Sequence, residues 1–436
     1  MFCMDPHDSK AYAEALDRAA MHLVKQVTPD GYVSASPTYR WYFPHWIRDS
    51  SFIAIALLHY ASFVREDGPG NSAAARAAAR HINEFNCTIA RKYSPGMSEL
   101  AKLGKGDSEF LKLKHHIYAR MGKDGDLAKL EFTDGSGRTI FMIDDTPERE
   151  RDSWLRQYDS IPLILLALET EAASVGLSDK ESAYLKEISP AITEYMHLIF
   201  RTPCSNIWEL EKEYMHAYNL AAIYCGMGTL RDMYGTVLSG QPEANAAIRM
   251  IDSDMPEVLV ELKKLVHDGI LYRRMLPGAD VDVGAGVGTA ELFAFTRFGI
   301  SDAELGVGVV RNTVSVMLRD RFGENTLPTR YKGDTYFTGG RWLLLGLELA
   351  ASGLAHDRDA DRAIDYVIGK YGQDLPEQEL VDPESPSSPD GLEDLRKNGN
   401  ATISPLNWSY AALADAIIRV LSGPVRQPAM RHLSKS

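Results

Sequence analysis

The chain has 436 residues, of which 45% are hydrophobic, 25% charged and 9% aromatic, a composition typical of a folded globular protein. Asp and Glu total 60 against 47 Lys and Arg, so the formal net charge is −13. A nucleic-acid partner is not expected, because its phosphates are also negative. The longest nearly apolar stretch, residues 52–64, is shorter than the roughly 20 residues that a membrane helix requires, so we expect no membrane span.

The amino terminus and the cysteines favour a reduced compartment. The first ten residues carry Asp5 and Asp8 and lack the apolar segment of a secretory signal. The four cysteines lack metal-site spacing and are too few for a disulfide scaffold in so long a chain. We therefore expect a cytoplasmic protein.

Helical periodicity dominates the chain. Apolar residues recur at helical spacing in about a dozen segments that follow one another across mostly short connections. The segments are 8–27, 49–66, 72–93, 154–174, 180–199, 209–234, 242–267, 286–299, 302–321, 341–355, 358–371 and 408–422. There is no alternation of strands with helices, so the pattern predicts an all-α fold of stacked helical hairpins or a helical barrel.

Two regions interrupt the helices. In residues 113–147 the turn residues DGSG separate two apolar runs, which predicts a small inserted β-hairpin. Residues 372–405 form a Pro-rich loop, and loops of this length are usually functional or disordered. No composition shift marks a boundary, so we expect one domain over residues 1–422 and a mobile tail at 423–436.

Several weaker motifs are better explained without a bound group. The Gly-rich residues 284–290 lack the strand–helix context of a dinucleotide loop, and the adjacent His115 and His116 are more typical of a surface than of a metal site. Asp144 and Asp145 stand alone, whereas a terpenoid cyclase on a helical barrel would carry a larger acidic metal cluster. The sequence therefore predicts neither a metal nor an organic cofactor.

Two carboxylates are candidates for acid–base chemistry. Glu209 follows Trp208, whose ring would desolvate the carboxyl and raise its pKa as a general acid requires. Alternatively, glutamates at the start of the helix expected at 209–234 would merely complement its dipole. Glu377 lies in the long loop, where a lone glutamate is more often a solvated surface group. Tryptophans beside charged residues, as at Trp46 and Trp342, fit either core packing or the aromatic wall of a sugar site.

Five segments in one order resemble those of the glucoamylase-type glycoside hydrolases of family 15. They are YFPHWIRDS at 42–50, IWE at 207–209, RYKGDTYFTGGRW at 330–342, LPEQ at 375–378 and PLNWSYAAL at 405–413. Each segment alone is a weak signal, whereas five in family order cover nearly the whole predicted barrel.

The resemblance implies an (α/α)6 barrel and inverting exo-hydrolysis of α-glucosides from the non-reducing end. Glu209 corresponds to the general acid and Glu377 to the general base. Two carboxylates and a water suffice for this reaction, so no cofactor is implied. A short oligosaccharide is the expected partner. The residues that correspond to the sugar site are Tyr42, Trp46, Arg48, Asp49, Ile207, Trp208, Arg330, Asp334 and Trp408.

The chain departs from the family pattern at two positions. Leu210 stands where fungal members carry a second glutamate, and Asn206 stands where Asp is common. Many bacterial relatives also carry an N-terminal β-sandwich, which we do not expect here because the first predicted helix begins near residue 8. The chain thus resembles a bacterial member that consists of the catalytic domain alone.

The substrate and some roles stay open at this stage. The change at Leu210 favours isomaltose and short α-1,6-linked oligosaccharides, while a malto-oligosaccharide glucoamylase, a trehalase of the same family and a non-catalytic carbohydrate-binding module are the alternatives. If Glu377 is not the base, Glu379 is the next candidate. The sequence does not indicate the role of Glu211 or the oligomeric state.

Overall fold

The structure is a computed structural model. It describes residues 6–38, 45–64, 69–102, 157–208, 211, 213–322, 327–334, 339–354, 357–372, 374–379 and 403–422, together with strands at 118–121, 127–128, 130–133 and 139–143. The tail expected to be mobile, 423–436, and most of the loop at 372–405 lie outside these residues, as do His115, His116, Asp144 and Asp145.

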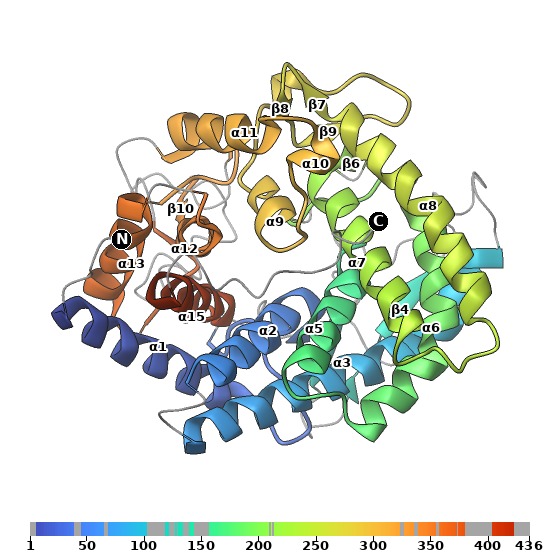
Figure 1. Cartoon of the computed structure of the whole chain (residues 1–436), viewed down its shortest axis with the longest axis horizontal. Coiled ribbons are helices and arrows are strands. Elements are labelled where there is room, and N and C mark those ends of the chain that lie inside the picture. Colours follow the sequence, from blue (N-terminus) through green and yellow to red (C-terminus); the bar gives the residue numbers. More distant parts are fainter. Residues whose placement is uncertain are drawn as a thin grey trace.

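Two concentric rings of helices make up the described part of the chain (Figure 1). The inner ring contains α2 (Ile47–Phe63), α5 (Ser160–Ser174), α7 (Ala217–Gly235), α9 (Glu291–Thr296), α12 (Leu343–Ser352) and α15 (Asn407–Ser422). Each inner helix packs against the next, and α15 closes the ring on α2. The outer ring contains α1 (Pro6–Gln26), α3 (Pro69–Lys102), α6 (Asp179–Ile199), α8 (Ala244–Lys264), α10 (Asp302–Leu305), α11 (Val309–Met317) and α13 (Asp357–Tyr371).

The helices of the two rings differ in how much of their surface is exposed to solvent. Inner helices such as α5 (SIPLILLALETEAAS) and α12 (LLLGLELAAS) are apolar on nearly every side, and most of their residues are buried. Outer helices such as α8 and α13 carry an apolar stripe and a charged face. A helix that is apolar all round must be covered on all sides, whereas an amphipathic helix covers others with one face. The alternation of the two kinds along the chain therefore produces the (α/α)6 barrel.

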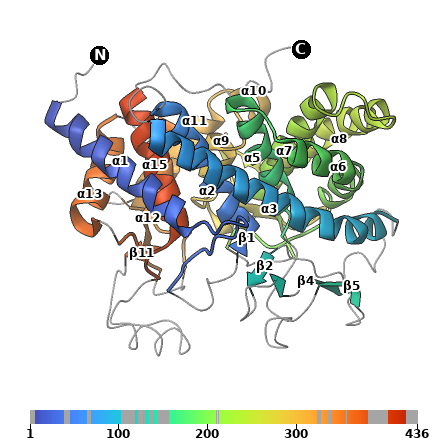
Figure 2. The same ribbon diagram turned by 90° about the horizontal axis from the view of Figure 1, so that it is seen from below.

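The strands are short, and several lie beyond one end of the helices. Figure 2 shows β1 (His45–Trp46), β2 (Tyr118–Met121), β4 (Leu130–Thr133), β5 (Thr139–Ile143) and β11 (Gln378–Glu379) on the same side of the barrel. The remaining strands are β3 (Leu127–Ala128), β6 (Met215–His216), β7 (Val266–His267), β8 (Ile270–Leu271), β9 (Arg274–Met275) and β10 (Arg341–Trp342). They pair antiparallel as β1–β2–β3, β4–β5, β6–β9, β7–β8 and β10–β11.

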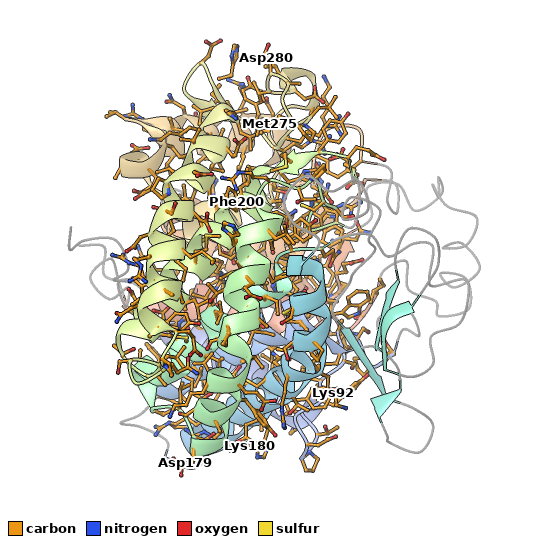
Figure 3. All side chains as sticks on the ribbon, turned by 90° about the vertical axis from the view of Figure 1, so that its right-hand side faces the viewer. Lys92, Asp179, Lys180, Phe200, Met275 and Asp280 are labelled. Carbon is orange, nitrogen blue, oxygen red and sulfur yellow. The ribbon has the colours of Figure 1, made fainter. Side chains whose placement is uncertain are left out.

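The sequence-based prediction of the fold is confirmed in its main features. The all-α class, the barrel and the hairpin inserted between helices, here β4–β5, are all present, and Figure 3 shows that hairpin beside the helices. No helix in the described ranges is long and apolar enough to cross a membrane.

Several helix boundaries differ from the prediction. The helix expected at 72–93 spans Pro69–Lys102, and the helix expected at 154–174 begins at Ser160. The helix expected at 209–234 begins only at Ala217, because Glu211 has a left-handed backbone (φ 62°) and β6 intervenes. The helix expected at 286–299 is reduced to α9, since residues 286–290 lead into it without helical structure. Near 302–321 the chain forms α10, α11 and the short helix η3 (Leu318–Phe322).

A buried ion network ties the inner helices together below the barrel end that carries the strands. The guanidinium of Arg297 bonds both carboxylate oxygens of Glu348 on α12 (Nε–Oε1 2.7 Å, Nη2–Oε2 2.6 Å) and also bonds Asp415 on α15. His59 on α2 bonds the other oxygen of Asp415 (Nδ1–Oδ1 2.9 Å). Burial alone raises the pKa of Asp415, but the charges of Arg297 and His59 outweigh it and lower the pKa to about 2.

Replacement of Asp415 by Asn should strongly destabilise the fold, because it leaves the buried charge of Arg297 with one carboxylate fewer. Breaking a buried ion network costs about 3–5 kcal/mol of unfolding free energy at neutral pH. Since the pKa of Asp415 is lowered on folding, its contribution is present above about pH 4 and is lost as the pH falls towards 2. Urea unfolding of both proteins between pH 2 and 7 measures this difference.

Asp252→Asn provides the matched control, because Asp252 pairs with Arg231 on the surface, where both side chains are nearly half exposed (47% and 44%). Exposed pairs of this kind contribute about 0–1 kcal/mol. Equal losses for the two variants, or a loss for Asp415→Asn that does not shrink at low pH, would contradict the role assigned to the buried network.

Candidate active site

Polar groups from distant parts of the sequence meet where the inner helices begin. Trp46, His216 and Trp342 each end a short strand and serve, in extended conformation, as the residue before α2, α7 and α12. The first N–H groups of a helix have no intrahelical partner, and the helix dipole makes this end positive. These helix starts therefore present hydrogen-bond donors and a positive potential at this end of the barrel.

Arg48 links the starts of three inner helices. Its Nε donates to Asp159 Oδ2 (2.6 Å), just before α5, and the Tyr218 hydroxyl of α7 donates to the same oxygen (2.9 Å). Its Nη2 donates to Gln157 Oε1 (2.7 Å). Arg48 and its neighbour Asp49, in the first turn of α2, are both at least nine-tenths buried. Arg48 is therefore a fixed part of the site wall rather than a freely moving surface group.

An aromatic wall with a fixed cation stands on the other side. The rings of Trp208 and Trp342 lie 4.9 Å apart, and the guanidinium of Arg330 lies 5.2 Å and 5.0 Å from the two ring centres. Asp334 holds Arg330 through two hydrogen bonds (Nε–Oδ2 2.8 Å, Nη2–Oδ1 2.6 Å). The carboxylate of Asp334 thus orients Arg330 beside the two rings, of which Trp208 is half-buried.

Glu377 lies on a segment that is pinned on two sides. It directly precedes β11, in which Gln378 pairs with Trp342 of β10. The backbone N–H of Glu377 donates to the carbonyl of Ile403 (2.8 Å), and the hydroxyl of Ser409 on α15 donates to the carbonyl of Pro376 (3.0 Å). Only 2% of Glu377 is exposed. The loop glutamate is therefore a buried, fixed group and not a solvated surface residue.

Gly340 explains how closely the strands around Glu377 approach. A Cβ atom at this position would lie 2.3 Å from Gln378 Oε1 and 2.8 Å from the carbonyl oxygen of Glu379. Both distances are too short for any side chain, so only glycine permits the contact. The Gly-Gly pair in the segment 330–342 therefore sets the position of β11 and of Glu377 beside it.

Glu379, the alternative candidate for the base, is bound to basic and phenolic groups instead. Its carboxylate accepts hydrogen bonds from Lys370 and from the Tyr366 hydroxyl (2.6 Å) on α13. Burial alone raises the pKa of Glu379, but these two hydrogen bonds outweigh it and lower the pKa. A carboxylate held in an ion pair is a poor proton acceptor, and this arrangement favours Glu377 as the base.

Aromatic rings close the barrel below the helix starts. Trp408, in the first turn of α15, stacks on Phe52 of α2 with ring centres 4.9 Å apart, and Phe293 of α9 packs against both. Trp408 is 6% exposed and Ile207 is 2% exposed. Both predicted sugar-site residues therefore lie in the packed floor and wall, as Trp46 does at the start of α2.

Two predicted site residues, Tyr42 and the candidate acid Glu209, lie outside the described residues. Of the residues around Glu209, the structure describes Asn206, Trp208 and Glu211. The backbone N–H of Trp208 donates a hydrogen bond to Asn206 Oδ1 (2.9 Å). The carboxylate of Glu211 forms ion pairs with Arg273 and Arg274. In the parts of the chain that the structure describes, no group of three or more His, Cys, Asp or Glu side chains is placed to hold a metal ion.

The sequence analysis missed the residues that hold the site residues in place but lie outside the five family-like segments. Asp159, Gln157, Tyr218 and Arg273 belong to none of the five segments. A signal existed for Asp159, since a charged residue directly before the apolar run 160–168 requires a buried partner. The paired arginines Arg273 and Arg274 gave no such signal, because adjacent basic residues are common on surfaces.

Glu291 is a further buried acid, and it lies near Arg273. It begins α9 and is 2% exposed, and its Oε2 lies 2.8 Å from the position that a Cβ at Gly288 would occupy. Burial raises the pKa of Glu291 to about 8, although the charge of Arg273 opposes the shift. At neutral pH this carboxyl is therefore mostly protonated.

Solved structures of glycosidases and glucoamylases have a similar architecture. A glycosidase variant in complex with glucose superposes with a TM-score of 0.68 at 19% identity, over 95% of this chain and 98% of that one. The glucoamylase from Saccharomycopsis fibuligera gives 0.57 at 15% identity over 95% and 94%, and the family 15 glucoamylase from Hypocrea jecorina gives 0.58 at 16% identity over 94% and 71%. The chain therefore has a glucoamylase-like fold.

The likeness lies in the structure and not in overall sequence similarity. No protein-family model matches the sequence, and no match is found among curated proteins. At identities below 20%, the fold is conserved while the amino acids that build it have changed.

Replacement of Glu291 by Gln should leave the fold intact and make it more stable in alkali. Gln has the shape of the protonated carboxyl but never ionises. Because folding raises the pKa of Glu291 from its ordinary value near 4.5 to about 8, the wild type loses stability as the pH rises between these values. The slope is at most about 1.4 kcal/mol per pH unit.

The measurement is the unfolding free energy of both proteins in urea at pH 5, 7 and 9. The advantage of Glu291→Gln should grow from pH 5 to 8 and then stay constant. A difference that is independent of pH would mean that Glu291 is ionised in the folded protein, and the assignment of a buried neutral acid would be wrong.

Proposed function

We propose that this protein is an inverting, exo-acting α-glucoside hydrolase, whose single catalytic domain spans residues 1–422 and which acts in the cytoplasm. The observation that carries the proposal is the pinned, buried Glu377 at the same barrel end as Arg48 and the Trp208–Trp342–Arg330 wall. The chemistry of these groups is that of a sugar site, with aromatic faces for the ring and charged groups for the hydroxyls. The glycosidase and glucoamylase neighbours support the same class of reaction.

The proposed reaction transfers one glucosyl unit to water. Glu209, protonated, gives its proton to the glycosidic oxygen as the bond between this oxygen and the anomeric carbon breaks. Glu377, ionised, takes a proton from a water whose oxygen attacks the anomeric carbon from the opposite face. Such inversion requires carboxyl groups about 6.5–9.5 Å apart, which leaves room for the water. The products are β-glucose and the shortened sugar.

The remaining predicted residues receive roles in binding the terminal glucose. Arg48 and Asp49 would bond its hydroxyls from the start of α2, and Arg330, oriented by Asp334, would do so from the opposite wall. Trp208 and Tyr42 would flank the sugar ring in the transition state. The carbonyl of Ile207 and the floor that contains Trp408 would limit the depth of the site.

For the substrate we propose isomaltose and short α-1,6-linked oligosaccharides. The support is Leu210, which replaces a second acidic residue directly after the candidate acid and so removes a polar contact on the leaving-group side. In a polar site the loss of one hydroxyl partner costs enough free energy to change which linkage is accepted. A malto-oligosaccharide glucoamylase and a trehalase remain the rival specificities.

Substitutions at the two carboxylates should have different chemical signatures. Glu377→Gln should lower kcat about 10²–10⁴-fold with little change in KM, because the attacking water loses its base. In Glu377→Ala, added azide should attack in place of water and yield β-glucosyl azide. Glu209→Ala should lose hydrolysis of isomaltose but retain much of its hydrolysis of α-glucosyl fluoride, since fluoride leaves without a proton. Glucose release and NMR of the products measure these effects.

The control is Glu379→Gln, two residues after the proposed base. It should lose far less activity than Glu377→Gln, because the carboxylate of Glu379 is occupied by Lys370 and Tyr366. The first product seen by NMR should be β-glucose. Release of α-glucose would refute the inverting mechanism, and equal losses at Glu377 and Glu379 would refute the assignment of the base.

A panel of disaccharides tests the linkage. We expect kcat/KM for isomaltose to exceed that for maltose and for trehalose by about tenfold or more, which corresponds to roughly 1.4 kcal/mol in the transition state. A tenfold preference for maltose would overturn the linkage and leave the hydrolytic mechanism in place. A correctly folded protein that binds sugars and releases no glucose from any α-glucoside would instead indicate a carbohydrate-binding module.

A further inference from the structure

Glu211 is held by more charged and polar groups than a surface glutamate. Its carboxylate accepts hydrogen bonds from Arg273 (Nη1–Oε2 3.0 Å) and from Arg274, and Nη2 of Arg273 forms an ion pair with the other carboxylate oxygen (Nη2–Oε1 2.9 Å). Asn206 Nδ2 donates to its second oxygen (3.2 Å). Only 17% of the Glu211 side chain is exposed. Four donors on one carboxylate exceed what an exposed helix-start glutamate would attract.

The backbone of Glu211 is unusual as well. Its φ of 62° lies in the left-handed region, which a non-glycine residue adopts at a cost in conformational energy. Its carbonyl accepts hydrogen bonds from the Tyr214 N–H (3.2 Å) and from His216 Nε2 (3.0 Å). Burial lowers the pKa of His216 to about 4, so the ring is neutral and donates through Nε2. Side chain and backbone together fix the turn that follows residues 206–210.

The two arginines connect this turn to the rest of the site. Arg274 of β9 also pairs with Asp282 (Nε–Oδ2 2.9 Å), and its guanidinium lies 4.2 Å from the ring centre of Tyr214. The guanidinium of Arg273 lies 4.5 Å from the ring centre of Tyr331, the neighbour of Arg330. Strand β9 pairs with β6, which directly precedes α7, so Arg274 lies next to the start of an inner helix.

We propose that Glu211 is a positioning residue: its ion pairs with Arg273 and Arg274, and its hydrogen bond from Asn206, close the short segment 206–211 and fix the geometry from which the general acid works. The inference rests on the proposed function, in which Glu209 is that acid. Asn206 is bonded to Glu211 at one end of the segment and to the Trp208 N–H within it. The described residues on both sides of Glu209 are therefore bonded to one another, and Glu211 is anchored to Arg274 of β9.

The Glu211 carboxylate with its partners Arg273, Arg274 and Asn206 is called the clamp. The test separates the effect of losing this clamp from the effect of changing the left-handed turn at Glu211. Asn is favoured in the left-handed region, so Glu211→Asn keeps the turn and removes the clamp, while Glu211→Gln keeps the length of the side chain and removes its charge. In both variants hydrolysis of isomaltose should fall about 10–100-fold, because a shift of about 1 Å in a catalytic group has an effect of this size. Hydrolysis of α-glucosyl fluoride, which needs no proton donor, should fall less than about threefold.

The matched control is Asp268→Asn. Asp268 is also a non-glycine residue with positive φ (50°), but its side chain is 84% exposed and its ion pair with His267 is a surface contact. This variant should leave both activities unchanged. Arg274→Gln is the second variant, and because it removes part of the same clamp, its effect should not add to that of Glu211→Gln in the double variant.

Amide hydrogen exchange gives a readout that does not depend on activity. The N–H groups of Trp208 and Tyr214 should exchange faster in Glu211→Asn and Glu211→Gln than in the wild type and in Asp268→Asn. Unchanged exchange there, or equal losses on isomaltose and on the fluoride, would overturn the positioning role. A fully active Glu211→Asn beside an inactive Glu209→Gln would overturn it while the proposed function stands. A wild type that hydrolyses no α-glucoside would overturn both.

Discussion

The burial of the inner helices governs everything else in this molecule. Helices such as α2, α5, α12 and α15 are covered on all sides, so their flanks have no surface on which to bind a ligand. Chemistry is confined to the barrel ends, where backbone groups lack intrahelical partners and polar side chains can be tolerated. Arg48, Asp159 and Trp342 all occupy such starts. The same burial that stabilises the barrel thus leaves its ends as the places where polar side chains gather.

The fold was predictable from sequence to the extent that it depends on periodicity. Apolar residues at helical spacing gave the helices, and the turn residues 134–137 between two apolar runs gave the β4–β5 hairpin, because both signals are local. The start of α7 was not predictable. Its helical pattern extends back to residue 209, but the long-range ion pairs of Glu211 with Arg273 and Arg274 favour a left-handed turn there, and no local rule contains that interaction.

The site residues divide in the same way, into those that local sequence signals predict and those that only long-range contacts define. Family-like segments identified Glu377, Arg330 and Trp408 as candidates, and the structure places all three among the buried residues at the inner-helix starts. The supporting groups escaped detection because they are defined by contacts across long sequence distances, as between Arg48 and Asp159. The composition of the long loop also favours a solvated surface position for Glu377, whereas the residue is buried. Its burial results from pairing with β10 and from hydrogen bonds near α15, which a Pro-rich stretch does not reveal.

The closure of the inner ring by α15 has a consequence for how the chain folds during synthesis. The last helix that the structure describes, α15, packs against α1 and α2. The apolar faces of these first helices are therefore covered only after nearly the whole chain has been made. Contacts between such distant residues slow folding and prolong the exposure of apolar surface. A nascent chain that stops before Asn407 leaves Phe52 without its stacking partner Trp408.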